Sequence, residues 1–310
     1  MSRRHVALFV LLCALWGFSF VALKVALRHV DPIFLGSIRY WLPGFLVLGF
    51  CAVIRRPIRI PARRLPAVAL LGVVNTGLLT LFLNLGQREI SAALGSILLY
   101  TYPLMAAIVS PIFLGEHIDR WKVAGIAVGF GGILLVAGFG GHASALGVAY
   151  VLLGAASWAV GTVIFKRIIP EHDVFTLTAW QLLFGAIFMS IVSAAVEGVP
   201  HADFTANVWL AYLWLTIPGM AVAGTLWYWL LERGEAAVAS AYMFMTPVFG
   251  VFFGWVVLSE DLGWTQLAGG LLVAVSIYLV NRTAAATAEP TRQPAQAAAL
   301  SPRISGRQIG

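Results

Sequence analysis

Leu15-Trp16-Gly17-Phe18-Ser19, with Lys24 after it, decides the fold, because it recurs as Ser157-Trp158-Ala159-Val160-Gly161 with Lys166 after it. The two tryptophans and the two lysines are each separated by 142 residues (158 − 16 = 142). Related segments that keep the same internal spacing indicate that the chain contains an internal repeat.

A second match lies further along each repeat. Ala92-Ala93-Leu94-Gly95-Ser96 is followed by Pro103 and Glu116, and Ala236-Ala237-Val238-Ala239-Ser240 is followed by Pro247 and Glu260. Their separation is 144 residues (247 − 103 = 144), so the duplication contains a slip of two residues. We therefore divide the chain into a first repeat at residues 1–140 and a second at residues 141–282. Residues 283–310, which are rich in Ala, Thr, Pro, Gln and Arg, are predicted to form a disordered cytoplasmic tail.

The composition predicts a membrane protein. The chain is 60% hydrophobic and 11% charged, and its mean hydropathy is +0.90. A soluble chain of this length could not cover so much apolar surface, whereas a bilayer solvates it. Ten apolar stretches have spanning length: residues 6–27, 33–54, 66–86, 91–114, 121–139, 146–166, 174–196, 207–230, 236–258 and 264–281. Because each repeat holds an odd number of spans, the sequence predicts an all-α integral membrane protein of ten transmembrane helices in two inverted five-helix repeats.

The basic residues predict the orientation. With the N-terminus in the cytoplasm, nearly all of the 20 Lys and Arg lie in cytoplasmic loops or tails. Arg28 and Arg88 lie on the far side, and Lys24 and Arg39 lie inside spans. The positive-inside rule then gives a multi-pass protein with both termini in the cytoplasm. The same distribution explains the basic charge by topology and lipid contact, so no nucleic-acid partner is expected. A cleavable signal peptide at residues 2–27 is the alternative for the first span, but this span has a counterpart inside the second repeat.

The polar side chains at mid-depth are uncharged and aromatic, apart from Arg39. Every Asp and Glu falls in a loop or at a span end, and neither Cys13 nor Cys51 belongs to a metal or redox motif. No catalytic motif lies in the spans, so we expect no enzyme, metal or cofactor. Rings, hydroxyls and amides at depth can line a cavity for a small organic solute. The predicted cavity residues are Trp16, Ser19, Phe20, Arg39, Tyr40, Asn75, Tyr100, Trp158, Thr162, Gln181, Tyr228 and Tyr242.

Three charged positions in the spans leave two interpretations open. Arg39 lies about 9 Å into its span, given a rise of 1.5 Å per residue. It could extend to the interface or clamp a substrate carboxylate or phosphate. Lys24 and Lys166, which occupy matched positions, are expected to extend to the interface. In the second repeat Gln181 replaces Arg39, so the charge at depth is asymmetric.

Pro103 and Pro247 occupy matched positions inside apolar spans. Each removes a backbone hydrogen bond, and we expect each to kink its helix. Matched breaks in corresponding segments are typical of a binding site or hinge in transporters built from inverted repeats. Both prolines are therefore predicted hinges.

Several of these residues resemble the EamA branch of the drug/metabolite transporter superfamily. They are Ala14-Leu15-Trp16-Gly17, Arg39, and the paired segments Tyr102-Pro103-Leu104 to Gly115-Glu116 and Thr246-Pro247-Val248 to Ser259-Glu260. The resemblance covers roughly residues 6–281. It implies helices 1–4 and 6–9 around a central cavity, alternating access and a bacterial inner membrane.

The resemblance also implies the function. The chain is expected to be a secondary transporter that exports small organic metabolites, chiefly aromatic or apolar amino acids and related compounds. A sugar-phosphate or nucleotide-sugar exchanger of the same superfamily is the alternative, but phosphate would require more positive charge at depth. A channel or structural subunit is a further class. The expected partners are a small-molecule substrate and the lipid bilayer, and both a monomer and a homodimer remain open.

Overall fold

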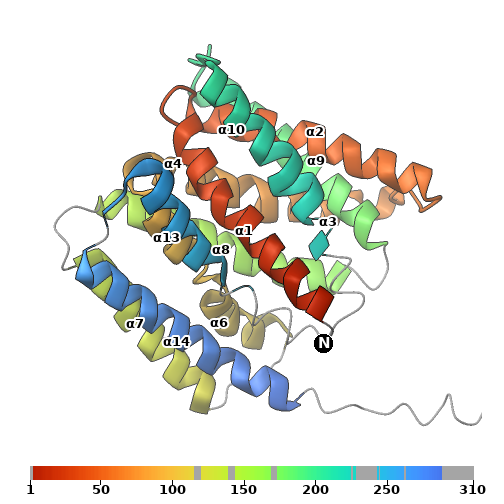
Figure 1. Ribbon diagram of the computed structural model, residues 1–310. Helices are drawn as coiled ribbons and strands as arrows, with labels where there is room; N and C mark the ends of the chain where they lie inside the picture. The colour runs from red at the N-terminus through yellow and green to blue at the C-terminus, as the bar shows by residue number, and fades with distance from the viewer. Residues whose placement is uncertain are drawn as a thin grey trace, which may run out of the picture.

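A computed structural model describes residues 3–114, 120–138, 144–168, 173–224, 226–227, 243, 245–261 and 263–287. Within these residues the chain is almost entirely helical (Figure 1), and the β structure is limited to a bridge between Val30 and Ala202. The elements are α1 (Arg3–Ala26), α2 (Pro32–Val53), η1 (Ala62–Arg64), α3 (Leu65–Gly72), η2 (Val73–Leu78), α4 (Leu79–Glu89), α5 (Ala92–Leu99), α6 (Tyr102–Leu114), α7 (Arg120–Gly138), α8 (Ala145–Ile168), α9 (Val174–Val196), α10 (Ala206–Thr216), η4 (Ile217–Val222), α13 (Met245–Leu258) and α14 (Trp264–Thr287).

Helix length and apolar composition agree with a multi-pass membrane protein. Among the described residues, five helices are long and apolar enough to cross a bilayer: Val6–Ala26, Pro32–Val53, Ala62–Glu89, Ala145–Ile168 and Val174–Val196. Five further apolar helices are shorter: Ala92–Ala106, Val123–Leu135, Ala206–Val222, Met245–Leu258 and Leu267–Ser276. Each overlaps one of the ten stretches selected from hydropathy.

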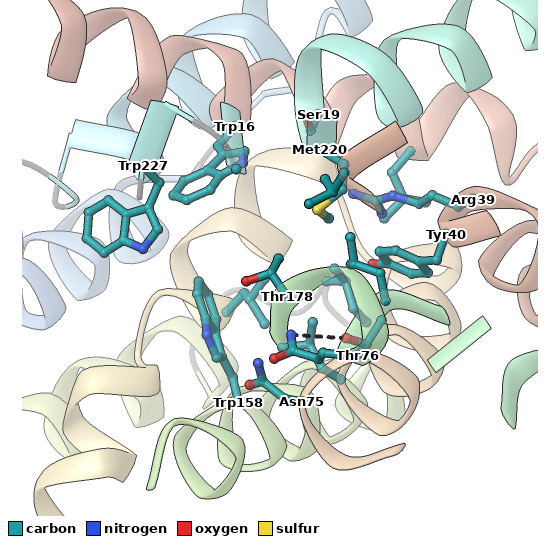
Figure 2. A pocket seen from close by; sticks show the side chains of 18 of the residues that line it. Trp16, Ser19, Arg39, Tyr40, Asn75, Thr76, Trp158, Thr178, Met220 and Trp227 are labelled. Atoms are coloured by element: carbon teal, nitrogen blue, oxygen red, sulfur yellow. Dashed lines mark hydrogen bonds between the residues drawn. The ribbon is translucent and has the colours of Figure 1, made fainter. Parts of the chain in front are cut away.

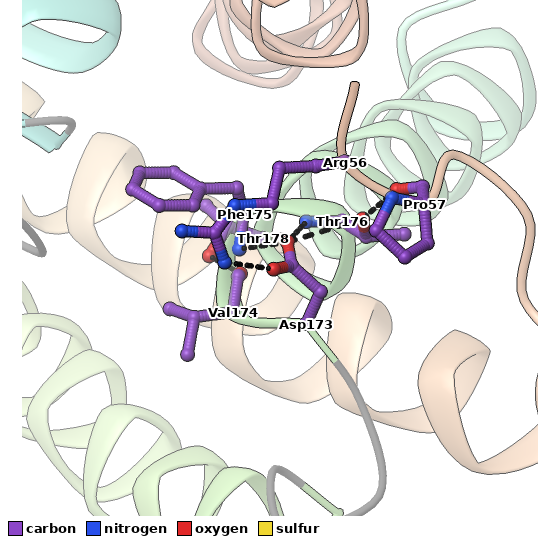
Figure 3. Close-up of polar contacts among 7 residues, drawn as sticks. All are labelled: Arg56, Pro57, Asp173, Val174, Phe175, Thr176 and Thr178. Carbon is purple, nitrogen blue, oxygen red and sulfur yellow. Dashed lines mark hydrogen bonds and ion pairs between the residues drawn. The ribbon is translucent and has the colours of Figure 1, made fainter. Parts of the chain in front are cut away.

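The repeat-related helices α2 and α9 run antiparallel, and the end of each is tied to the start of the other. At one end, the Glu197 carboxylate accepts hydrogen bonds from the backbone N–H groups of Ile33 and Phe34, at 2.8 and 2.7 Å. At the other end, Arg56 forms an ion pair of 2.7 Å with Asp173, the N-cap of α9 (Figure 3). A 22-residue helix is about 33 Å long at 1.5 Å per residue, so the two ties lie a membrane thickness apart.

The helices α7 and α14 form a pair at one edge of the molecule (Figure 1). A Cβ atom added to Gly132 would lie 2.8 Å from the Gly269 carbonyl oxygen, and one added to Gly129 would lie 2.5 Å from the Ser276 hydroxyl. Only glycine permits so close an approach, which explains the glycine-rich faces of these two helices. The order of these contacts makes α7 and α14 antiparallel, and their glycine faces pack within one chain.

Two irregular turns occupy matched positions in the repeats. The π-helix η2 begins at Val73 and the π-helix η4 begins at Ile217 (217 − 73 = 144), and both are six residues long. A π turn carries one residue more than an α turn and leaves some backbone groups without their α-helical partners. These segments lie in the third apolar stretch of each repeat.

The fourth apolar stretch is broken rather than kinked. Tyr100 and Thr101 separate α5 from α6, and Pro103 is the second residue of α6. Pro247 is likewise the third residue of α13. Both prolines therefore lie in a first helical turn, where the missing N–H group needs no intrahelical partner. The expectation of a proline inside a continuous helix is corrected accordingly.

The turn between α4 and α5 is held by two charged residues from distant segments. Lys24 Nζ of α1 donates to the backbone carbonyls of Gln87, Arg88 and Ile90, at 2.8, 3.1 and 2.7 Å. The Glu260 carboxylate accepts from the N–H groups of Ala92 and Ala93, at 2.7 and 3.0 Å. The cation therefore meets a helix C-terminus and the anion a helix N-terminus, as the helix dipoles favour. Lys24 binds these carbonyls inside the protein, so the expectation that it extends to the lipid interface is wrong.

Candidate functional site

A cavity of about 220 Å³ lies between the two repeats (Figure 2). Its described walls come from α1, α2, η2, α4 and α5 of the first repeat and from α8, α9 and η4 of the second. None of its described lining residues belongs to α7 or α14, which lie at the edge of the molecule. The volume is below the roughly 300–1,000 Å³ of sites for drug-sized ligands, which points to a small solute.

Most of the predicted cavity residues line this one cavity. They are Trp16, Ser19, Phe20, Arg39, Tyr40, Asn75, Tyr100, Trp158 and Gln181. Thr162 is not among the residues that line it. Tyr228 and Tyr242 lie outside the described residues. Neither Pro103 nor Pro247 reaches the cavity wall.

One side of the cavity is aromatic. The rings of Trp16 and Trp227 lie 6.1 Å apart. Trp158 stacks on Tyr102 at 3.9 Å and meets the edge of Tyr100 at 5.8 Å. Figure 2 shows Trp16, Trp227 and Trp158 grouped on the side of the cavity away from Arg39. Such rings can hold an apolar or aromatic group of a solute.

The π-helix η4 contributes directly to this aromatic side. Trp16 Nε1 donates to the Gly219 carbonyl at 2.9 Å, inside η4. A carbonyl in a π turn can accept such a bond when it lacks its usual helical donor. The irregular turn therefore fixes the orientation of the Trp16 ring.

The opposite side of the cavity is polar. The hydroxyls of Tyr40 and Thr80 share a hydrogen bond of 2.7 Å, and Gln181 Nε2 donates to the Thr76 hydroxyl at 3.3 Å (Figure 2, dashed line). Three buried atoms of lining residues have no hydrogen-bond partner in the described part of the chain: Arg39 Nε, Asn75 Oδ1 and Gln181 Oε1. An unpaired buried polar atom costs about 1–3 kcal/mol, so a hydrogen-bond partner would stabilise each of these three atoms.

Arg39 is the one charged side chain among the described lining residues. Its side chain is 93% buried, and its guanidinium lies 5.4 Å from the centre of the Tyr40 ring. No carboxylate pairs with it in the described structure. The described residues also contain no group of three His, Cys, Asp or Glu that could hold a metal ion.

Glycine contacts bring each π-helix against the first helix of the opposite repeat. A Cβ atom on Gly219 would lie 2.6 Å from the Ser19 hydroxyl of α1. In the equivalent contact, a Cβ atom on Gly161 of α8 would lie 2.3 Å from Asn75 Oδ1 of η2. Each contact joins one glycine to one polar side chain, but the glycine is on the π-helix in one repeat and on the straight helix in the other. The two contacts place Ser19 and Asn75 at the cavity wall.

Sequence reasoning missed some lining residues. Thr178 and Met220 reach the cavity, although neither was selected from its position (Figure 2). Met220 is the repeat equivalent of Thr76, which also lines the cavity (220 − 76 = 144). That repeat relation is the signal that could have found Met220.

Comparisons with known proteins agree with the duplicated helical architecture. The sequence profile of the EamA-like transporter family matches residues 4–138 and 145–282. The uncharacterized transporter YvbV of Bacillus subtilis is 31% identical to this chain, over 90% of the chain and 92% of the relative. A probable amino-acid metabolite efflux pump of Salmonella typhimurium is 28% identical, over 92% and 99%. A crystal structure covering 93% of this chain and 100% of its own has a TM-score of 0.66 at 17% identity, which shows a shared fold.

Proposed function

The chain belongs to the EamA-like transporter family of the drug/metabolite transporter superfamily, and we propose that it exports small organic metabolites as a secondary transporter. Its proposed cargo is amino acids with aromatic or apolar side chains and related compounds. The observation that carries this proposal is the cavity, which combines an aromatic side with a buried guanidinium and lies between the two repeats. Relatives from Salmonella typhimurium and Escherichia coli are named probable amino-acid metabolite efflux pumps, which supports the same cargo class.

The charge in the cavity argues against the alternative cargo. A sugar phosphate or nucleotide sugar carries a multiply charged phosphate group, which proteins usually bind with several cations or backbone N–H groups. Arg39 is the one cation among the described lining residues. A single guanidinium suits one carboxylate better.

We further propose ten spans in two inverted repeats, with both termini in the cytoplasm of a bacterium and the protein in its inner membrane. The antiparallel packing of α2 with α9 and of α7 with α14 supports inversion, because each pair joins repeat-related helices. The packing scheme is also preserved when the repeats are exchanged. For example, α1 contacts α13 and η4, and α8 contacts their counterparts α6 and η2.

We propose that alternating access works by an exchange of conformations between the two repeats. If the two halves can swap conformations, a cavity closed on one face in one state opens on that face in the other. The proposed hinges are Pro103, directly after the break between α5 and α6, and Pro247, which occupies the matched position in the first turn of α13.

Cysteine labelling tests the inverted topology. Arg59 and Val199 are exposed and lie at opposite ends of the α2–α9 pair, whereas the native Cys13 and Cys51 are fully buried. We expect R59C to react only from the cytoplasmic side and V199C only from the other side with an impermeant maleimide. Labelling of both from the same side would contradict the inverted arrangement.

Counterflow in proteoliposomes tests the transport function. Vesicles loaded with unlabelled phenylalanine or leucine should accumulate the labelled amino acid transiently and with saturation. Vesicles that contain wild-type protein but exchange no amino acid, amine or aromatic solute would contradict the proposed function.

A further inference from the structure

We infer that the cavity binds its solute as a zwitterion between two opposed poles. Arg39 would take the carboxylate, and the side-chain oxygens of Gln181 and Asn75 would take the ammonium group. This inference rests on the proposed function and adds which chemical groups of the solute the site binds.

The cationic pole is Arg39. Its guanidinium makes no hydrogen bond or ion pair with the described residues, although the side chain is only 7% exposed. Burying an unpaired charge is costly, so such a group normally has a partner of opposite charge. A carboxylate suits it best, because the planar guanidinium can donate two parallel hydrogen bonds to the two carboxylate oxygens. The α-carboxylate of an amino acid can supply that partner.

The acceptor pole is built at the position equivalent to Arg39. Gln181 corresponds to Arg39 through the repeat (181 − 39 = 142), and its side chain is also 7% exposed. The bond from its Nε2 atom to Thr76 fixes the amide and leaves Oε1 without a donor. Asn75, which directly precedes Thr76 in η2, also has no donor for its Oδ1 atom in the described part of the chain. An ammonium group donates three hydrogen bonds and can satisfy both oxygens.

The two poles differ in strength. The carboxylate would meet a full positive charge in a buried site, whereas the ammonium group would meet neutral amide oxygens. The guanidinium and the carboxylate attract each other as two unit charges, whereas the ammonium group meets only the dipoles of neutral amides. The site should therefore discriminate more strongly against loss of the carboxylate than against loss of the ammonium group.

The aromatic side completes the recognition. Trp16, Trp158 and Trp227 lie away from Arg39 in Figure 2 and can contact the solute side chain. This arrangement suits an amino acid whose side chain is apolar or aromatic, because the charged end and the apolar end meet different walls.

Matched inhibitors test the two poles in wild-type proteoliposomes. Counterflow of labelled phenylalanine would be inhibited by phenylalanine, by 3-phenylpropionate, which lacks the ammonium group, and by 2-phenylethylamine, which lacks the carboxylate. Leucine, 4-methylpentanoate and 3-methylbutylamine form a second set for leucine counterflow. We expect the amines to inhibit about 10- to 100-fold more weakly than the amino acids, as expected for a lost charged hydrogen-bonding partner. The carboxylates should inhibit more strongly than the amines, because they keep the ion pair with Arg39.

Variants assign the poles to residues. R39Q should abolish the preference for 3-phenylpropionate over 2-phenylethylamine, and R39K should retain part of it. Q181E should shift the preference toward the amine, because it places a carboxylate at the acceptor pole. R88Q, at an exposed arginine, serves as the matched control and should leave the ratio unchanged.

Three results separate the inference from the function. If the wild type exchanges phenylalanine or leucine but its amine and carboxylate analogues inhibit equally, the two-pole inference is wrong and the transport function stands. If R39Q weakens inhibition by all three compounds equally, Arg39 has a purely structural role and the two-pole inference is likewise wrong. Absence of exchange in the wild type would instead contradict the proposed function itself.

Discussion

Replacement of Glu197 by alanine should destabilise the contact between the repeats. The Glu197 carboxylate lies after α9 in the second repeat, yet it caps the first turn of α2 in the first repeat. It also accepts a hydrogen bond from the Ser193 hydroxyl at 2.8 Å. In E197A, the N–H groups of Ile33 and Phe34 lose their acceptor at a helix N-terminus, where the helix dipole favours an anion.

The size of the loss follows from the geometry. Two hydrogen bonds to a charged acceptor contribute about 3–6 kcal/mol when fully buried, at about 1.5–3 kcal/mol each. Glu197 is half-buried, and water can replace part of the interaction, so we expect about 2–3 kcal/mol less unfolding free energy. Unfolding of the purified protein in an SDS titration would measure it. The control is D203N, at an exposed acid on the same side of the molecule. A loss below about 0.5 kcal/mol in E197A, or one equal to that of D203N, would refute the reasoning.

Two further substitutions probe the α4–α5 turn and the π-helix contact. K24M should lower the unfolding free energy by about 2–4 kcal/mol, because three backbone carbonyls lose a charged donor, and R28M should have little effect. Equal losses in the same SDS titration would show that the lysine bonds are unimportant. G161V should reduce phenylalanine counterflow at least about 10-fold, because the added atoms would displace Asn75 from the cavity wall. G131V, where a Cβ atom would meet nothing within 4 Å, should retain counterflow, and similar activity in both variants would contradict this prediction.

Hydropathy and the internal repeat predicted much of the helical organisation. The apolar stretch at residues 66–86 corresponds to α3, η2 and α4, and the stretch at 91–114 corresponds to α5 and α6. The irregularities inside these stretches were not predicted as they occur. Hydropathy reports only that a segment is apolar, whereas a π turn depends on backbone hydrogen bonding. Pro218 can account for the π turn in η4, but η2 contains no proline.

The candidate site was predictable where polar or aromatic residues lie at depth, as for Arg39, Asn75 and Trp158. Depth alone could not show which way a side chain faces, because apolar residues surround these helices on all sides. Thr162 was therefore assigned to the cavity although it does not line it. Lys24 was misjudged for a related reason, since its partners are backbone carbonyls that leave no mark in the sequence.

The matched π turns also bear on how old this architecture is. The six residues of η2 and the six of η4 have no identical position, yet both segments begin at the same place in their repeats. Independent acquisition of an extra helical residue at one site in two copies is less economical than inheritance from a single gene that already carried it. The wider turn would then predate the doubling of the gene, and each copy has since changed its amino acids without straightening the helix.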